Sequence, residues 1–320
     1  MVSRADIEPL DRQFQESRTG DMVWIPGGTF RMGSDKHYPE EAPIHRVMVD
    51  GFWIDRTPVT NLQFKEFVLD TGHRTFAEIP PDPENYPGAL PQMLYAGSLV
   101  FSPPPRVTNL RDWSQWWDFM RGADWRHPHG PKSNINVLDN HPVVHVSFAD
   151  ALAYAKWVGK DLSTEAEWEF AARGGLEGAE FAWGDEFMPG GMHMANTWQG
   201  EFPGQNLNAD GYERTSPVTA FPPNGYGVHD MIGNVWEWTS DWYSPKHEAD
   251  APKRAASLKI RAAAGKRAAT TLVCLTSGFL AGSSRAARIY ARPIIAAAIA
   301  RPPAMPNPSI PRPATSDSAA

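Results

Sequence analysis

Hydrophobic positions recur at helical spacing in three segments, and each segment begins at a capping signal. The first follows Thr60 and Gln63, which have the spacing of a capping box, and its apolar residues share one face. The second follows Ser147, and the third follows Thr164 with Glu167 in the box position. We therefore predict three helices, which end near Gly72, Gly159 and Gly174.

Alternating apolar and polar positions near the start of the chain predict strands. Residues 22–34, MVWIPGGTFRMGS, hold two short apolar stretches around Pro-Gly-Gly, and this pattern predicts a hairpin. Residues 45–55, HRVMVDGFWID, place Val47 and Val49 on one face. That alternation predicts a further half-buried strand.

Long segments without periodicity separate these elements. Residues 78–146 and 176–232 are rich in Pro, Gly, Asn and aromatic residues. Irregular segments of this length are uncommon in compact domains, and they are usually functional or held by ions. We find no internal repeat of fixed period. The pattern predicts a loop-rich α+β domain with little regular secondary structure.

Charge and composition divide the 320-residue chain near residue 250. Residues 251–320 hold eleven Lys and Arg against one acid, a charge of +10, whereas the whole chain carries −7. The same residues include twenty Ala, and no Trp follows Trp242. Such a composition buries too little apolar surface to offset ordering entropy, so we predict a disordered tail. The tail lacks the pattern of aromatic residues interleaved with basic ones, and any recognised module, that would indicate nucleic-acid binding.

These observations predict three regions. Residues 1–20 form an N-terminal extension without a secretory signal pattern, residues 21–250 form the domain, and residues 251–320 form an aberrant Ala/Arg/Pro-rich tail. The sequence has no run of about eighteen apolar residues, so we predict no membrane span. The only cysteine is Cys274, which excludes an intramolecular disulfide and favours a cytoplasmic location.

Several motifs together resemble one family. IPGGTFRMGS, WRHPHGP, HPVVHVSFADALAYAKWVGKDLSTEAEWEFAARGG, ANTWQGEFP and AFPPNGYGVHDMIGNVWEWTSDWY are similar to the formylglycine-generating enzymes, or sulfatase-modifying factors, from about residue 21 to 250. The resemblance implies a formylglycine-generating-enzyme fold related to C-type lectins, with bound calcium. It also implies oxidation of the cysteine in a CxPxR motif of a nascent sulfatase to Cα-formylglycine, with molecular oxygen and a copper ion held by two cysteines. We expect neither a nucleic acid nor a membrane as partner.

The resemblance also implies two calcium sites, since calcium prefers carboxylate and carbonyl oxygens in irregular loops. The ligands of the first would be the side chains of Asn196 and Asp210 and the carbonyls of Thr197 and Tyr212. Those of the second would be the side chains of Asp230 and Glu237 and the carbonyls of Gly233 and Val235. Without the resemblance, Asn196 would be interpreted as a turn cap and the acids as solvated.

The aromatic-rich stretch that contains Trp113, Trp116, Trp117 and Trp125 has two interpretations. Tryptophans at this spacing are more often core residues, because each buries a large area. The resemblance instead implies that this stretch borders a groove for an extended substrate peptide, lined by Trp116 or Trp117.

Histidines give no metal motif. The only HxxxH pair is His141 and His145, in a segment that the sequence predicts to be extended. Four residues of strand separate two side chains by roughly 13 Å, which is too far to share an ion. A three-histidine iron site, as in the related ergothioneine-forming enzymes, would need a helical domain upstream.

The cysteine pair that the resemblance implies is missing from these 320 residues. Cys274 lies in TTLVCLTSGF, which matches the surroundings of neither family cysteine. In a neighbouring reading frame, residues 283–301 are compatible with LKGGSHLCAPNYCRRYRP, which is the family's ending. We therefore predict a one-nucleotide frameshift near Lys253 and an inactive chain. The alternatives are a noncatalytic lectin-like binding module and a product without function.

Overall fold

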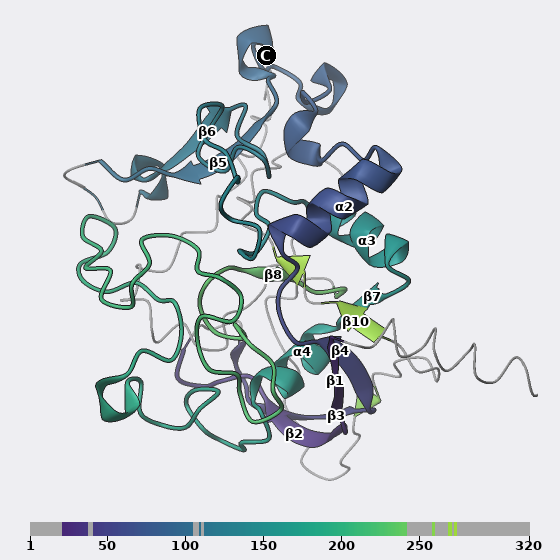
Figure 1. Cartoon of the computed structure of the whole chain (residues 1–320), viewed down its shortest axis with the longest axis vertical. Coiled ribbons are helices and arrows are strands. Elements are labelled where there is room, and N and C mark those ends of the chain that lie inside the picture. The colour runs from purple at the N-terminus through teal and green to yellow at the C-terminus, as the bar shows by residue number, and fades with distance from the viewer. Residues whose placement is uncertain are drawn as a thin grey trace, which may run out of the picture.

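The computed structural model describes residues 21–37, 41–104, 109 and 112–241, together with the short segments 258–259, 268–270 and 272–273 (Figure 1). The predicted extension 1–20 and most of the predicted tail, with Cys274, lie outside the described residues. Among the helices of the described part, none is long and apolar enough to cross a membrane.

Three helices match the prediction from capping signals. They are α2 (Asn61–Thr71), α3 (Phe148–Trp157) and α4 (Glu165–Ala172). Each starts with a complete capping box, at Thr60, Ser147 and Thr164. Gly72 ends α2 in the left-handed conformation, as expected, whereas α4 ends at Arg173, one residue before Gly174. Single 3-10 turns follow in the long loops: η2 (Phe76–Glu78), η3 (Pro83–Asn85), η4 (Pro91–Met93), η5 (Trp113–Gln115) and η6 (Pro189–Gly191).

The predicted hairpin around Pro-Gly-Gly is wrong. β1 (Met22–Ile25) pairs with β4 (Phe52–Asp55), and β2 (Gly28–Met32) pairs with β3 (His45–Val49), in two different sheets. Gly27 does not reverse the chain: a Cβ there would lie 2.6 Å from the carbonyl oxygen of Val49. The segment between β1 and β2 therefore crosses the β3–β4 turn at backbone contact, which only glycine permits.

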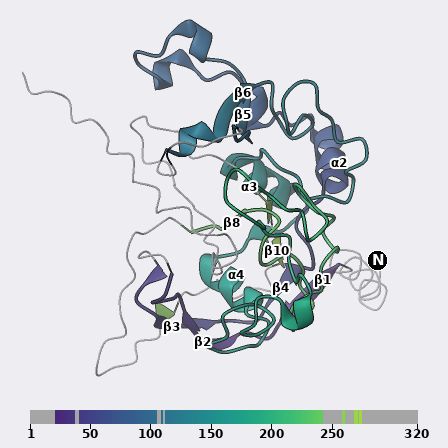
Figure 2. The ribbon, with the colours of Figure 1, turned by 90° about the vertical axis from the view of Figure 1, so that its left-hand side faces the viewer.

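Two further pairings complete the described sheets. β5 (Gly97–Phe101) and β6 (Trp117–Arg121) form an antiparallel pair at one end of the molecule, beside α2 (Figure 1). α4 lies over β1 to β4 at the other end in both views (Figures 1 and 2). The irregular residues 176–236 fill the side between them and lead into β8 (Glu237–Trp238).

The tail contributes strands, which the prediction of a disordered tail did not include. β9 (Leu258–Lys259) pairs with β3, β10 (Ala268–Thr270) inserts between β4 and β7 (Asp161–Leu162), and β11 (Leu272–Val273) pairs with β8. Strand pairing uses backbone groups that every non-proline residue carries, so an Ala-rich segment can complete a sheet whose neighbours leave room for it.

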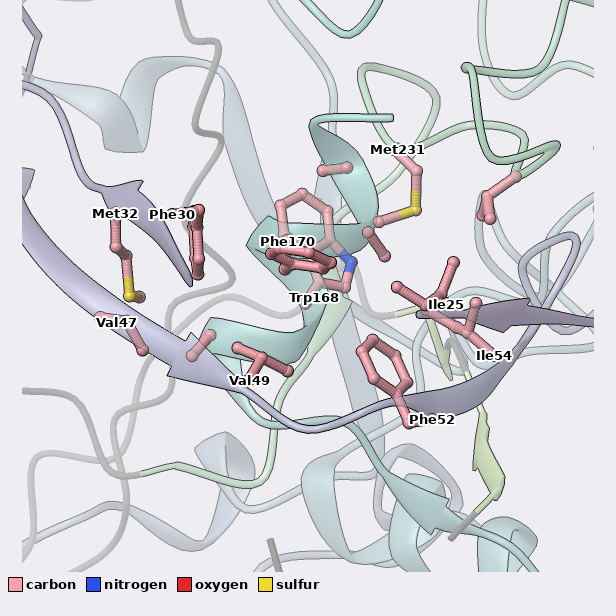
Figure 3. Packing of buried hydrophobic residues seen from close by; sticks show 14 of the residues in the cluster. Ile25, Phe30, Met32, Val47, Val49, Phe52, Ile54, Trp168, Phe170 and Met231 are labelled. Carbon is pink, nitrogen blue, oxygen red and sulfur yellow. The ribbon is translucent and has the colours of Figure 1, made fainter. Parts of the chain in front are cut away.

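Two large clusters of buried hydrophobic residues lie in the described part of the chain, beside two smaller ones. The first joins β1 to β4 with α4, and Figure 3 shows Trp168 and Phe170 of α4 among Ile25, Val49 and Phe52 of the strands. The second joins α2, α3 and β7 around Trp125, which is 1% exposed. Each buried side chain of this size contributes roughly 1.5–3 kcal/mol. Met231, from the loop that leads into β8, belongs to the first cluster.

Candidate ion-binding loops and aromatic cluster

Residues 230–237 form an irregular loop whose backbone is held in unusual conformations. Asp230 and Asn234 have positive φ values, 54° and 56°, and Gly233 has 78°. Positive φ is uncommon for residues other than glycine and persists only where surrounding contacts require it. We call residues 230–237 the second loop.

The two acids of the second loop are both buried. Asp230 is 8% exposed and Glu237 is 3% exposed. Burial raises the pKa of Asp230 to about 7, opposed by a hydrogen bond that Asn234 Nδ2 donates over 3.1 Å. Burial also raises the pKa of Glu237 to about 8, and the charge of Asp230 contributes to the same shift. The two carboxylates are therefore close enough to repel each other in a site of low polarity.

Glu237 has one oxygen in use and one free. Its Oε2 accepts a hydrogen bond from the indole Nε1 of Trp168, whereas its Oε1 has no hydrogen-bond partner among the described residues. A buried carboxylate oxygen without a donor is costly unless a cation compensates it. The Gly233 carbonyl accepts the Val235 N–H over 2.7 Å and keeps a second lone pair. This donor set fits a hard cation such as calcium.

The other predicted group lies beside this loop, in residues 196–212, which we call the first loop. There the Asp210 carboxylate accepts the backbone N–H groups of Thr197 over 3.1 Å and of Tyr212 over 3.0 Å. Asn196 Nδ2 donates to the Arg214 carbonyl over 2.7 Å, and the Thr197 carbonyl accepts a hydrogen bond from Gln199. Of the groups that the resemblance assigns to an ion here, the Asp210 carboxylate and the Thr197 carbonyl thus already have partners inside the protein.

The two loops touch through the backbone. The Asn234 N–H donates to the Asn196 carbonyl over 2.9 Å. A Cβ at Gly233 would lie 2.2 Å from that same carbonyl oxygen, so no side chain fits there. Asn234 also exchanges hydrogen bonds with Ser216, over 3.0 Å and 3.2 Å. Asn234 was not among the residues predicted from the sequence, although Asn is a typical residue at positive φ.

The predicted substrate tryptophans lie in an aromatic cluster, which we define as Phe101, Trp116, Trp117, Trp198 and Phe202. Trp116 is 2% exposed, and its ring packs edge-on against Phe202 at 5.7 Å. Trp117 is half-buried and packs against Phe101 at 5.3 Å. The indole Nε1 atoms of Trp116 and Trp198 are buried, and neither has a partner within the described part of the chain.

The two histidines of the HxxxH pair have separate partners. His141 Nδ1 lies 3.0 Å from Thr215 Oγ1, whereas His145 lies 2.8 Å from both Ser98 Oγ and the Pro128 carbonyl. The segment is not a regular strand, because His145 has a φ of 59°. Among the described residues, no group of three or more His, Cys, Asp or Glu side chains is arranged to hold a metal. The second loop has two carboxylates and would need carbonyl ligands.

The fold and the site define a loop-rich α+β domain with a pair of buried carboxylates in an irregular loop. The family model described as "Sulfatase-modifying factor enzyme 1-like domain" matches residues 8–292. The chain belongs to this family, and this confirms the resemblance stated from the motifs.

Proteins named formylglycine-generating enzyme are among its relatives. The one from Mycobacterium tuberculosis (strain ATCC 25618 / H37Rv) is 54% identical over 254 residues, 79% of this chain and 85% of that protein. The one from Mus musculus is 47% identical over 234 residues, 72% of this chain and 60% of that protein. A Bos taurus protein named "Inactive C-alpha-formylglycine-generating enzyme 2" is 43% identical over 237 residues, 71% of this chain and 72% of that protein. Among solved structures, PvdO from Pseudomonas aeruginosa is 29% identical with a TM-score of 0.46, covering 70% of this chain and 72% of that one.

Proposed function

We propose that this chain is a sulfatase-modifying factor domain that binds the cysteine-bearing segment of a nascent sulfatase without oxidising it. The observation that carries the proposal is the cysteine count, since one cysteine occurs in 320 residues. Soft copper(I) is best held by paired thiolates, and a single thiol does not supply that pair. The donor set therefore does not fit the copper site that the resemblance implies, and we derive no catalytic step through copper.

The aromatic cluster supports the binding part of the proposal. Its rings join β5, β6 and the first loop, with Phe202 contacting both Trp116 and Trp198. Half-buried aromatic rings such as Trp117 are suited to an extended peptide, because they can pack against its apolar side chains. The CxPxR segment is the peptide that the family relationship favours.

We propose calcium as the ion of the second loop. Asp230 and Glu237 would supply carboxylate oxygens, and Gly233 and Val235 would supply carbonyls. The bound ion would contribute two positive charges between carboxylates that otherwise repel. We also propose a second, weaker calcium at the first loop, since two N–H donors already stabilise the Asp210 carboxylate without an ion.

A second candidate is a product without function, which the frameshift hypothesis favours. Resequencing the gene across codons 248–260 tests that hypothesis: a frame that yields the family's ending indicates a sequencing error and an active enzyme. A confirmed shift leaves the noncatalytic binder, with a lectin-like fold, and the functionless product as alternatives. The cytoplasmic location stays a prediction.

Two measurements on the full chain test the proposed function. A fluorescent CxPxR peptide should bind, by anisotropy, while oxygen consumption with copper and peptide stays at the level of a no-enzyme control. Trp117→Ala should weaken peptide binding about tenfold or more, as interface aromatics commonly do. Leu69→Ala removes a side chain that is 76% exposed on α2, outside the aromatic cluster, and should leave peptide binding unchanged. Turnover above the control would refute the noncatalytic reading, and absence of peptide binding would favour the functionless product.

A further inference from the structure

The side chain of Glu237 accepts a hydrogen bond from α4. The indole N–H of Trp168 donates to Oε2, and Oε1 stays without a partner among the described residues. With Oε2 held in this way, Oε1 is the oxygen that remains available to a ligand.

Trp168 is itself fixed in position. It is 8% exposed and belongs to the core cluster of α4 and the strands, beside Phe170 (Figure 3). α4 starts at the Thr164 capping box, which sets the register of its residues. Rotation of the indole ring would disturb this packing, so its N–H points in one direction.

Further hydrogen bonds hold the chain after Glu237 against the start of α4. The Ser240 N–H donates to the Ser163 carbonyl over 2.8 Å, and the Glu165 N–H donates to the Asp241 carboxylate. The backbone on either side of Glu237 is therefore constrained, by α4 on one side and by the positive-φ residues of the second loop on the other.

We propose that Trp168 is a positioning residue for the second loop: its indole N–H fixes Glu237 Oε2 and leaves Oε1, which has no partner among the described residues, available to the ion. This inference rests on the calcium site proposed above and adds a residue that contacts no ion itself. Hydrogen bonds to metal-ligating side chains typically change metal affinity 10- to 100-fold, because they orient the ligand.

The test replaces the N–H while keeping an aromatic ring, in the full chain. Trp168→Phe should raise the dissociation constant for calcium about 10- to 100-fold in calorimetric titration after chelation. Trp157→Phe is the matched control, because the Trp157 indole also donates to a carboxylate, Asp70, over 2.7 Å, on a different helix. It should leave the calcium affinity unchanged.

The outcomes separate the inference from the proposal beneath it. If the wild-type chain takes up no calcium, both are wrong. If wild type binds calcium and Trp168→Phe binds it equally well, the calcium site stands and the positioning role is wrong. An equal loss of melting temperature with and without calcium, at unchanged affinity, would also assign Trp168 a merely structural role.

A second measurement avoids reliance on a folded variant. In wild-type chain labelled at the indole nitrogens, a calcium titration followed by NMR should move one indole N–H resonance with the midpoint of the calorimetric binding. A set of indole resonances that does not respond to bound calcium would overturn the inference.

Discussion

The first and second loops carry the same kinds of residue in opposite states. In the first loop, both oxygens of Asp210 accept backbone N–H groups. In the second loop, Glu237 is buried with Oε1 lacking a partner among the described residues, and Asp230 is buried near it. The sequence motifs predict the same kind of ion site in both loops, whereas the hydrogen-bond partners of the carboxylates differ between them.

The difference teaches what each loop needs in order to stay folded. A carboxylate with two N–H donors is stabilised in its charged form without further help. Two buried carboxylates with few donors are not, and their raised pKa values, about 7 and about 8, reflect that cost. A bound cation would compensate both charges at once, so we expect the second loop to depend on an ion more than the first does.

Gly233→Ala gives the largest expected effect, because it breaks the contact between the loops. The new Cβ would lie 2.2 Å from the Asn196 carbonyl oxygen, and φ is +78°. We expect a loss of about 3 kcal/mol or more in the free energy of unfolding by urea denaturation. Gly178→Ala has a similar φ of +75° with no atom within 4 Å, so it should cost only about 1–2 kcal/mol. Equal losses for the two variants would contradict the close contact.

Glu237→Gln tests the second loop alone. At calcium concentrations 100-fold above its dissociation constant, wild type should gain about 2.7 kcal/mol, or about 5–10 °C in melting temperature. The Gln variant should lose this gain, because a neutral amide binds calcium poorly. In chelator it should be no less stable than wild type, since burial disfavours the charged carboxylate that it replaces. If calcium still raises the melting temperature of Glu237→Gln by the same amount, the ion binds at another site.

Asp210→Asn tests the first loop in the same way. The amide can accept one of the two N–H groups but not both, so we expect a loss of about 1–2 kcal/mol with or without calcium. Calorimetry should retain the tighter calcium binding and lose the weaker one. Loss of the tighter binding instead would show that the first loop, not the second, binds calcium more tightly.

What the sequence could predict depended on how far apart the interacting residues lie. The capping boxes at Thr60, Ser147 and Thr164 join residues three apart, and all three helices followed. The hairpin at Pro-Gly-Gly failed because Gly27 contacts the β3–β4 turn, a contact with no local signal. Glu237 was identified through the family resemblance, whereas its partner Trp168 lies 69 residues away, and no local signal joins the two.

His145 adds a third buried group to the comparison and gives the smallest expected effect. Like Asp210 it has partners on both sides, Ser98 and the Pro128 carbonyl, yet burial lowers its pKa, with the nearby charges of His129 and Asp124 acting in opposite directions. When the pKa of a base is lower in the folded protein than in the unfolded chain, the unfolded chain takes up the proton first. The folded protein therefore loses stability as the pH falls below the pKa of His in the unfolded chain, about 6.5.

The substitution His145→Gln should remove this step, since the amide can accept from Ser98 and donate to Pro128 as the neutral ring does. Urea denaturation between pH 8 and pH 5 should show a shallower decline in the free energy of unfolding for the variant than for wild type. An unchanged decline would mean that other groups account for the acid sensitivity, and that a buried group with two partners carries no pH dependence of its own.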